Sequence, residues 1–242
     1  MSATPRRPLR LLHTSDVHLG GYEPDLARRA LEAVVDAVRS TGAGALLVAG
    51  DLFDHSRVAD AEVAFFLAQV ARLDVPVVVL PGNHDTVDAG SVYQRPAFAA
   101  APPNLHVLDD PQGRTLELPG LGLVLWGRAT RDHTPAFRPL QGVPPRNGAP
   151  WYVALAHGHL LEAGAGEHRS SPIAPQEIAA APCDYVALGH WDRFADVSQG
   201  GVRACYSGAP HWTPGRYGLL GHVALVHLTP EEGARVSRLP LG

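Results

Sequence analysis

Side chains that can bind metal ions follow five separate apolar runs of this 242-residue chain. The residues at these places are Asp16, His18, Asp51, Asn83, His157, His190 and Asp192. Carboxylates, imidazoles and an amide oxygen suit divalent ions such as Mn²⁺, Fe²⁺ or Zn²⁺, and the set contains no thiolate. Two ions about 3.5–4 Å apart require a bridging ligand with two oxygens. A carboxylate at the centre of the set meets this requirement, and Asp51 is the candidate.

Two such ions would supply a nucleophile at neutral pH, because a hydroxide held by both is readily formed there. We expect this hydroxide to attack a phosphorus atom in line with the leaving oxygen, while the ions offset charge on the equatorial oxygens. His84 directly follows Asn83 and would face the substrate, where it stabilises or protonates the leaving group. The predicted chemistry is hydrolysis of a phosphate ester, with His84 and Asp51 as catalytic residues.

Each fragment also has a structural interpretation when it is taken alone. An Asp-x-His sequence after a strand fits a turn and a helix cap, and Gly-Asp is a common turn pair. His157 alone fits a hydrogen-bonded core histidine. Five independent turns that all carry metal-capable side chains in an apolar setting nevertheless favour one shared site.

The first half of the chain alternates between apolar runs and amphipathic patterns. Residues 9–13, 45–49 and 75–80 have the composition of buried strands. Residues 25–40 and 60–73 have the apolar spacing of helices. This alternation predicts right-handed crossovers and a parallel sheet. The metal-capable side chains would then follow the carboxyl ends of the strands, the edge at which open α/β sheets bind ligands.

The second half predicts mainly strands. Residues 114–118 and 121–126 flank a Pro-Gly pair and predict a hairpin. The other expected strands are residues 151–156, 185–188, 202–206, 223–228 and 234–239. The expected long loops are residues 130–150 and 163–175. We therefore predict an α/β fold in which residues 1–242 form a single domain of two packed sheets with helices outside.

The order of these motifs resembles that of the calcineurin-like metallophosphoesterase superfamily. Its pattern is Asp-x-His, Gly-Asp, Gly-Asn-His-Asp/Glu, His and Gly-His-x-His, and it is matched here between Asp16 and Asp192. The resemblance implies a four-layer α/β/β/α sandwich of two packed mixed sheets, with His84 assisting phosphoryl transfer. It implies that one metal ion is bound by Asp16, His18 and Asp51. It implies that the other is bound by Asp51, Asn83, His157 and His190.

Within the superfamily, the chain is similar to the bacterial SbcD-like DNA repair exonucleases. The similar stretches are residues 11–20, 50–54, 186–190 and 206–210. Those exonucleases carry a further capping domain and a segment that docks an ATPase partner, and we expect neither in these 242 residues. The phosphate-ester substrate could thus be DNA or a nucleotide, and no ATPase partner is expected.

Asp192 departs from the family pattern, because the last position of Gly-His-x-His is an aspartate here. In the family, that histidine completes the first metal site. We predict that Asp192 coordinates in its place; the alternative is that it misses the metal and water fills the gap. A carboxylate at this position makes the site harder and favours Mn²⁺ or Fe²⁺ over Zn²⁺. The expected cofactors are therefore two divalent ions, with Mn²⁺ first and Fe²⁺ or Zn²⁺ as alternatives.

Other polar residues lie near these motifs. Asp54 and Asp85 are expected to orient ligands or cap helices. His159 could replace His157 as a ligand or contact the substrate, and Trp191 fits either stacking on a base or ordinary packing. Solvated loop positions are the interpretation for Arg57, Arg193 and His211. His13 lies within a predicted strand and is expected in the core.

Composition narrows the function further. The net charge is −4, from 20 basic and 24 acidic residues, so the chain has no basic field for sequence-blind binding of nucleic acid. Residues 1–12 lack the apolar segment of a signal peptide, and no run has the length of a membrane span. The two cysteines fit no disulfide framework. We expect a cytoplasmic protein without a membrane partner, and its oligomeric state is left open.

Three functions remain. A dimetal phosphodiesterase, acting as a nuclease or a nucleotide phosphodiesterase, is preferred. A phosphomonoesterase or nucleotide hydrolase on the same scaffold is the alternative, because it would use the same nucleophile. A non-catalytic binding protein is the third, and the intact Asn83-His84 pair argues against it.

Overall fold

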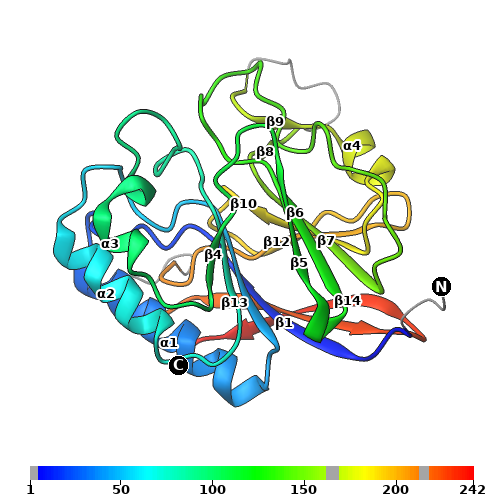
Figure 1. Ribbon diagram of the computed structural model, residues 1–242, viewed down its shortest axis with the longest axis horizontal. Coiled ribbons are helices and arrows are strands. Elements are labelled where there is room, and N and C mark those ends of the chain that lie inside the picture. The colour runs from blue at the N-terminus through cyan, green and yellow to red at the C-terminus, as the bar shows by residue number, and fades with distance from the viewer. Residues whose placement is uncertain (1–4, 162–168, 213–217) are drawn as a thin grey trace.

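A computed structural model describes residues 5–161, 169–212 and 218–242, and its strands form two six-stranded mixed sheets (Figure 1). The first sheet has the order β14-β13-β1-β2-β3-β4. Its strands are β1 (Leu9–Thr14), β2 (Ala45–Ala49), β3 (Val77–Leu80), β4 (Leu105–Val107), β13 (His222–Thr229) and β14 (Gly233–Pro240). Strands β1 to β4 are parallel, and β13 runs antiparallel to both β1 and β14.

The second sheet has the order β11-β12-β10-β7-β6-β5. Its strands are β5 (Arg114–Leu118), β6 (Leu123–Gly127), β7 (Trp151–His157), β10 (Tyr185–Gly189), β11 (Ala195–Asp196) and β12 (Arg203–Tyr206). Strands β6, β7, β10 and β12 are parallel, and the edge strands β5 and β11 are antiparallel to their neighbours. A short pair, β8 (His159–Leu160) and β9 (Pro172–Ile173), lies outside both sheets.

Helices cover the outer faces of the sheets. They are α1 (Pro24–Thr41), α2 (Asp60–Val70), α3 (Pro96–Ala99) and α4 (Pro175–Ala180), with 3₁₀ turns at Val92–Gln94 and Pro119–Leu121. In Figure 1, α1 and α2 lie on one side of the molecule and α4 lies on the other. The buried stripe of α1 includes Leu31 and Val34, and the helix ends at Gly42, whose φ of 63° suits a residue without a Cβ.

Three apolar clusters separate four layers. Leu31 and Phe66 of α1 and α2 pack on the outer face of the first sheet. Leu47 of β2 meets Trp151 of β7 in the cluster between the two sheets. Ile178 of α4 packs on the outer face of the second sheet. Because strands in the middle of such a sandwich are covered on both faces, they consist of continuous apolar runs. The α/β/β/α fold predicted from the sequence is confirmed.

The element boundaries differ slightly from the sequence expectation. The strand expected at residues 75–80 begins at Val77, since Pro76 has no N–H to donate and only its carbonyl accepts from Leu46. The helix expected over residues 60–73 ends at Val70. The hairpin is confirmed as β5 and β6, and residues 130–150 form the expected loop.

Other elements were not expected. The short elements β4, α3 and β11 were not predicted, and β8 and β9 were missed as well. Of the loop expected at 163–175, residues 163–168 lie outside the described residues, and β9 and the start of α4 occupy its end. Within the described part of the chain, no helix combines the length and apolar character needed to cross a membrane.

Candidate metal centre

The loops that carry the predicted ligands meet where the two sheets come together. Strands β1, β2 and β3 are parallel in the first sheet, and β7 and β10 are parallel in the second. Their carboxyl ends therefore lie side by side. Two contacts join the sheets: the amide of His190 donates to Oδ2 of Asp16 (3.0 Å), and Nε2 of His157 lies 3.2 Å from Oδ2 of Asp51.

Four of the predicted site residues have left-handed backbone conformations. The φ angles are 54° at Asp16, 50° at His18, 52° at Asp51 and 108° at His190. Among the described residues, only Ser171 shares this feature without being a glycine. The conformation is unfavourable for residues with a Cβ and is tolerated where the surroundings fix it. Backbone bonds from Asp16 N to Gly50 O (3.0 Å) and from His18 N to Asp51 O (3.1 Å) provide that support.

Asp51 lies at the centre of the group. Its side chain is almost fully buried, with Oδ1 accepting from the amide of His84 (2.9 Å). Oδ2 lies 3.2 Å from Nε2 of His157 and 4.0 Å from Nε2 of His18. Ligand atoms of Asp16, His18 and Asp51 all lie within 4.8 Å of one another. One carboxylate thus faces imidazoles on two sides, as a bridging ligand must.

The second predicted set gathers around Asn83. Its Oδ1 lies 2.9 Å from Nε2 of His157 and 3.1 Å from Nδ1 of His190. Nδ1 of His157 must donate to the carbonyl of Ala49 (2.9 Å), because a carbonyl only accepts. Nε2 of the same ring then faces the oxygens of Asn83 and Asp51. Two acceptors around one nitrogen create a place for positive charge, either a proton or a metal ion, so these residues fit a cation.

The charges of the group are strongly coupled. Burial raises the pKa of Asp16 to about 6, and the charge of Asp51 adds to this effect. Burial opposes the charged form of His157, but the charge and hydrogen bond of Asp51 outweigh it and raise the pKa of His157 to about 10. Burial likewise opposes ionisation of Asp51, yet His157 holds the pKa of that carboxyl below its usual value. Without a metal ion, the site keeps a proton on His157 in its place.

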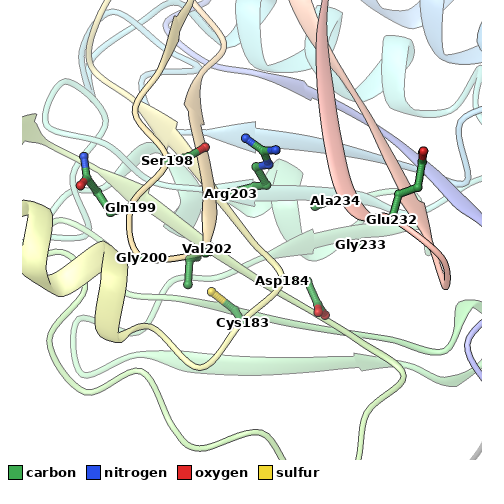
Figure 2. Close-up of a pocket in the computed structure, with 11 residues that line it drawn as sticks. Cys183, Asp184, Ser198, Gln199, Gly200, Val202, Arg203, Glu232, Gly233 and Ala234 are labelled. Atoms are coloured by element: carbon green, nitrogen blue, oxygen red, sulfur yellow. The ribbon is translucent and has the colours of Figure 1, made fainter.

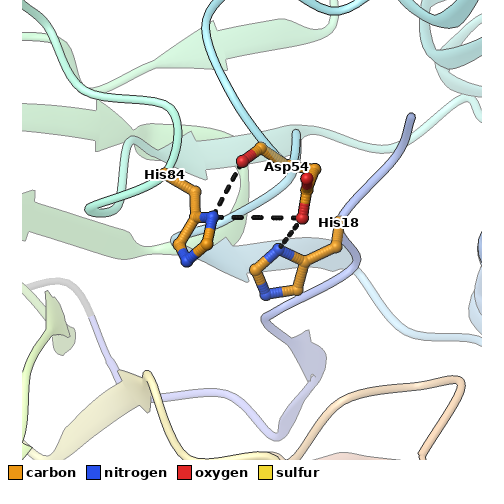
Figure 3. Close-up of side chains that lie close together, drawn as sticks. All are labelled: His18, Asp54 and His84. Atoms are coloured by element: carbon orange, nitrogen blue, oxygen red, sulfur yellow. Dashed lines mark hydrogen bonds and ion pairs between the residues drawn. The ribbon is translucent and has the colours of Figure 1, made fainter. Parts of the chain in front are cut away.

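Asp54 orients two histidines beside this group. Its Oδ1 lies 3.1 Å from Nδ1 of His18, and its backbone carbonyl accepts from Nδ1 of His84 (2.8 Å). Figure 3 shows the two rings on either side of Asp54, and their T-shaped contact has a centroid separation of 4.6 Å. Since Nδ1 of each ring is engaged, Nε2 of each remains for a metal ion or a substrate. The side chain of His84 is 43% exposed, as a residue that faces substrate requires.

Asp85 supports the loop from below. It is buried and accepts from the amides of Gly82 (2.7 Å) and Phe53 (3.1 Å) and from the hydroxyl of Tyr93 (2.6 Å). Burial and the charge of Asp51 raise its pKa. Gly82 packs so closely that a Cβ there would overlap the carboxylate of Asp51. The turn after β3 is therefore fixed in position by hydrogen bonds and by the lack of a side chain.

Asp192 does not join either set. Its side chain is exposed, and among the described residues it belongs to no group of three close ligand atoms. It lines a cavity of about 250 Å³ with His18, Asp54 and His211. It also lines a neighbouring cavity of about 400 Å³ with His159 and with His190, Trp191, Arg193 and Trp212. The structure thus places Asp192 at the entrance to the site.

The sequence analysis missed His133, and it assigned His211 to a solvated loop. The His133 ring lies 5.9 Å from that of His190, with Nδ1 3.1 Å from Oγ of Ser171. The ring of His211 lies 6.4 Å from that of His18, and its Nδ1 is buried without a hydrogen-bond partner among the described residues. Both histidines come from loops without apolar periodicity, so no sequence signal connected them with the site.

Trp191 packs against the protein. Its ring stacks on Tyr206 with a centroid separation of 4.3 Å, and Nε1 donates to Nδ1 of His159 (3.2 Å). The guanidinium of Arg193 lies over the indole at 4.8 Å. Ordinary packing, one of the two interpretations of Trp191, accounts for these contacts. Together these side chains form an aromatic wall with one cation beside the metal-capable residues.

A separate cavity of about 420 Å³ lies at the opposite ends of the strands (Figure 2). It is lined by Cys183 and Asp184 before β10, by residues 198–203 at the start of β12, and by Glu232 to Ala234 between β13 and β14. None of the predicted site residues lines it. Its buried acidic group is already paired, since Asp184 binds Arg6 and Arg146. The chemistry is concentrated at the carboxyl ends instead.

Comparisons with known proteins agree with this geometry. Residues 9–193 match the model of the family described as calcineurin-like phosphoesterase. The D component of the nuclease SbcCD from Bacillus subtilis (strain 168) is 29% identical over 279 residues, which cover 93% of this chain and 68% of that protein. The DNA double-strand break repair protein Mre11 of Methanopyrus kandleri is 30% identical over 86 residues, or 32% of this chain and 19% of that protein.

The fold itself has counterparts among solved structures. A dimetal phosphatase from Danio rerio matches with a TM-score of 0.61 at 9% identity, over 97% of this chain and 99% of that one. At so low an identity, the match shows a shared fold.

Proposed function

Because this chain belongs to the calcineurin-like phosphoesterase family, we propose that it hydrolyses phosphodiester bonds with the help of two divalent metal ions. One observation carries the proposal: the buried carboxylate of Asp51 lies between Nε2 of His18 and Nε2 of His157. A carboxylate in that position can serve two ions at once. Asp16 and His18 would hold one ion with Asp51. The other ion would be held with Asn83, His157 and His190.

The bound ions would activate water and offset the charge that develops on the phosphoryl oxygens. The chain's own residues position the reaction. The carbonyl of Asp54 fixes Nδ1 of His84, so that Nε2 of this exposed ring is left for the substrate. In its protonated form, His84 can donate to the leaving oxygen. Carboxylate and imidazole donors together favour Mn²⁺, with Fe²⁺ or Zn²⁺ as alternatives.

The substrate class proposed is a nucleotide or a DNA strand. Support comes from the similarity to the two nuclease-related proteins and from the aromatic wall of Trp191 beside the site. Aromatic rings with an adjacent arginine suit bases of single-stranded nucleic acid. The net charge of −4 leaves the metal ions as the main source of positive charge for a phosphate.

A substrate panel tests this function. The metal-free protein is loaded with Mn²⁺, Fe²⁺ or Zn²⁺ and assayed on bis-p-nitrophenyl phosphate, p-nitrophenyl phosphate, a nucleotide diester and single-stranded DNA. We expect turnover of the diesters, strongest with Mn²⁺, and none in the Asp51→Asn variant. Activity on the monoester alone would replace the diesterase with a phosphomonoesterase. Absence of turnover with every metal would leave a non-catalytic binding protein.

A further inference from the structure

The first metal site has a neighbour that its sequence motifs do not include. The site offers three ligand atoms, from Asp16, His18 and Asp51, which is fewer than a divalent ion of this type usually takes. The cavity of about 250 Å³ beside His18 contains one further imidazole, that of His211. Two further carboxylates line the same cavity without bonding to His18, and both are exposed: Glu23 and Asp192. An additional protein ligand has to come from these three side chains.

His211 has the features of a ligand without its ion. Its Nδ1 is shielded from solvent and lacks a hydrogen-bond partner among the described residues. A buried polar nitrogen in that state is destabilising unless something binds to it. Its ring faces that of His18 at a centroid separation of 6.4 Å. With metal–nitrogen bonds of about 2.1 Å, two imidazoles on opposite sides of one ion can have this separation.

The loop that carries His211 is held against the site. Ser207 Oγ lies 2.9 Å from Ser15 Oγ, which joins this loop to the residue before Asp16. The amide of Ala209 donates to the carbonyl of Asp192 (3.0 Å), and the amide of Trp212 donates back to Ala209 (3.2 Å). These bonds fix the backbone on both sides of His211. Asp192 contributes its carbonyl to this arrangement, while its carboxylate is exposed.

We infer that His211 is a ligand of the first metal ion and takes the place that the sequence pattern gives to residue 192. The inference rests on the proposed dimetal function and deepens it. Asp192 then has a different role, because its backbone anchors the loop of His211 and its side chain borders the entrance. A neutral imidazole adds no negative charge, so the first site keeps two carboxylates instead of gaining a third.

Metal binding to the whole protein tests the inference without an activity assay. Metal-stripped wild type is titrated with Mn²⁺ by calorimetry, and Co²⁺ absorption reports the number of ligands. We expect two ions in wild type. In His211→Ala, one of the two sites should weaken by at least about 10-fold and the Co²⁺ bands should change. In Asp192→Asn, both affinities should stay within about twofold of wild type. Free imidazole should restore the lost site in His211→Ala.

Controls separate ligation from folding. His227→Ala removes an imidazole from β13, outside the site, and should bind both ions normally. His211→Gln fills the same space with a poor ligand and should resemble His211→Ala. Circular dichroism and the metal-free melting temperature establish that each variant folds.

Three outcomes would overturn the inference. Both ions could bind normally to the folded His211→Ala and His211→Gln variants. The loss could appear in Asp192→Asn instead, which would return the ligand role to Asp192. The third is a raised KM with unchanged metal affinity, which would make His211 a substrate contact. If wild type itself bound no Mn²⁺ or Co²⁺, the proposed dimetal function would fail, whichever variants were made.

Discussion

The Nε2 atom of His157 lies 3.2 Å from Oδ2 of Asp51, and both side chains are almost fully buried. His157 ends β7 in the second sheet, and Asp51 follows β2 in the first. This pair therefore joins the two halves of the sandwich at the candidate metal centre. Removing either partner leaves an uncompensated charge or polar group in a dry environment, which is costly.

Asp51→Asn should abolish the function of the centre. The amide offers one oxygen instead of two, and it loses the negative charge that attracts both ions. We expect turnover to fall by at least about 100-fold and bound metal to fall from two ions to fewer than one. Metal content by mass spectrometry and steady-state kinetics measure both effects. The exposed Asp109→Asn is the matched control and should behave as wild type; normal metal content in Asp51→Asn would contradict the bridging role.

His84→Ala should separate chemistry from metal binding. The ring is 43% exposed, and its Nδ1 is bonded to the carbonyl of Asp54, so its removal leaves the ligand atoms in place. We expect kcat to fall by about 100-fold or more with two ions still bound. The defect should be smaller for a diester whose leaving group needs no proton, such as p-nitrophenol. Loss of metal from the folded variant would instead make His84 a ligand.

Gly82→Ala should disrupt the centre by overlap alone. A Cβ at this position would meet the side chain and amide of Asp51, although the backbone conformation of Gly82 is open to alanine. We expect weaker Mn²⁺ binding and a loss of stability of about 1–3 kcal/mol, measured by calorimetry and urea unfolding. Gly120→Ala, which has open space around it, is the control. Equal Mn²⁺ affinity in the two variants would show that the turn after β3 can relax.

His13 should make the metal-free protein less stable in acid. Burial lowers the pKa of His13 to about 3, against an ordinary value of 6.5, and the ring contacts the hydroxyl of Tyr185 (2.8 Å). Between these values, the unfolded chain binds a proton that the folded chain does not, so stability falls as the pH falls below 6.5. This one group should remove about 2 kcal/mol between pH 7 and pH 5.

Urea unfolding of the metal-free protein at the two pH values measures this loss. His13→Gln has no titrating group but keeps a polar partner for Tyr185, and its decrease between pH 7 and pH 5 should be smaller by about the same 2 kcal/mol. The comparison is needed because burial also lowers the pKa of other histidines, His190 and His133 among them. Parallel losses in the two proteins would mean that His13 is protonated in the fold.

The sequence predicted the elements whose residues are buried on both faces. Strands β2 and β3 are runs of apolar residues, and any other placement would expose them. The three residues of β4 are only partly buried, which leaves too little pattern to detect. Likewise, the motifs after the strands located Asp51 and His157, because strand ends at a shared edge must converge.

The position of His211 depends on contacts that the local sequence does not encode. The turn from β12 to the loop must bring Ser207 to Ser15, across 192 positions of the chain. Asp192 illustrates the opposite case: its place in the motif predicted a ligand, yet the backbone after His190 carries its side chain to the surface. Periodicity reports burial within one element, whereas a site between loops depends on how distant elements pack.

The place of β1 in its sheet has a further consequence for biosynthesis. Asp16 and His18 follow β1, which lies between β2 and β13, and β13 covers residues 222–229. A ribosome therefore releases every predicted ligand before it releases the strand that holds the first of them in line. Nascent chains that lack β13 leave β1 with a bare edge. Incorporation of metal would accordingly be a late event in the maturation of this protein, and the cation pool it meets at that moment would decide which ion it carries.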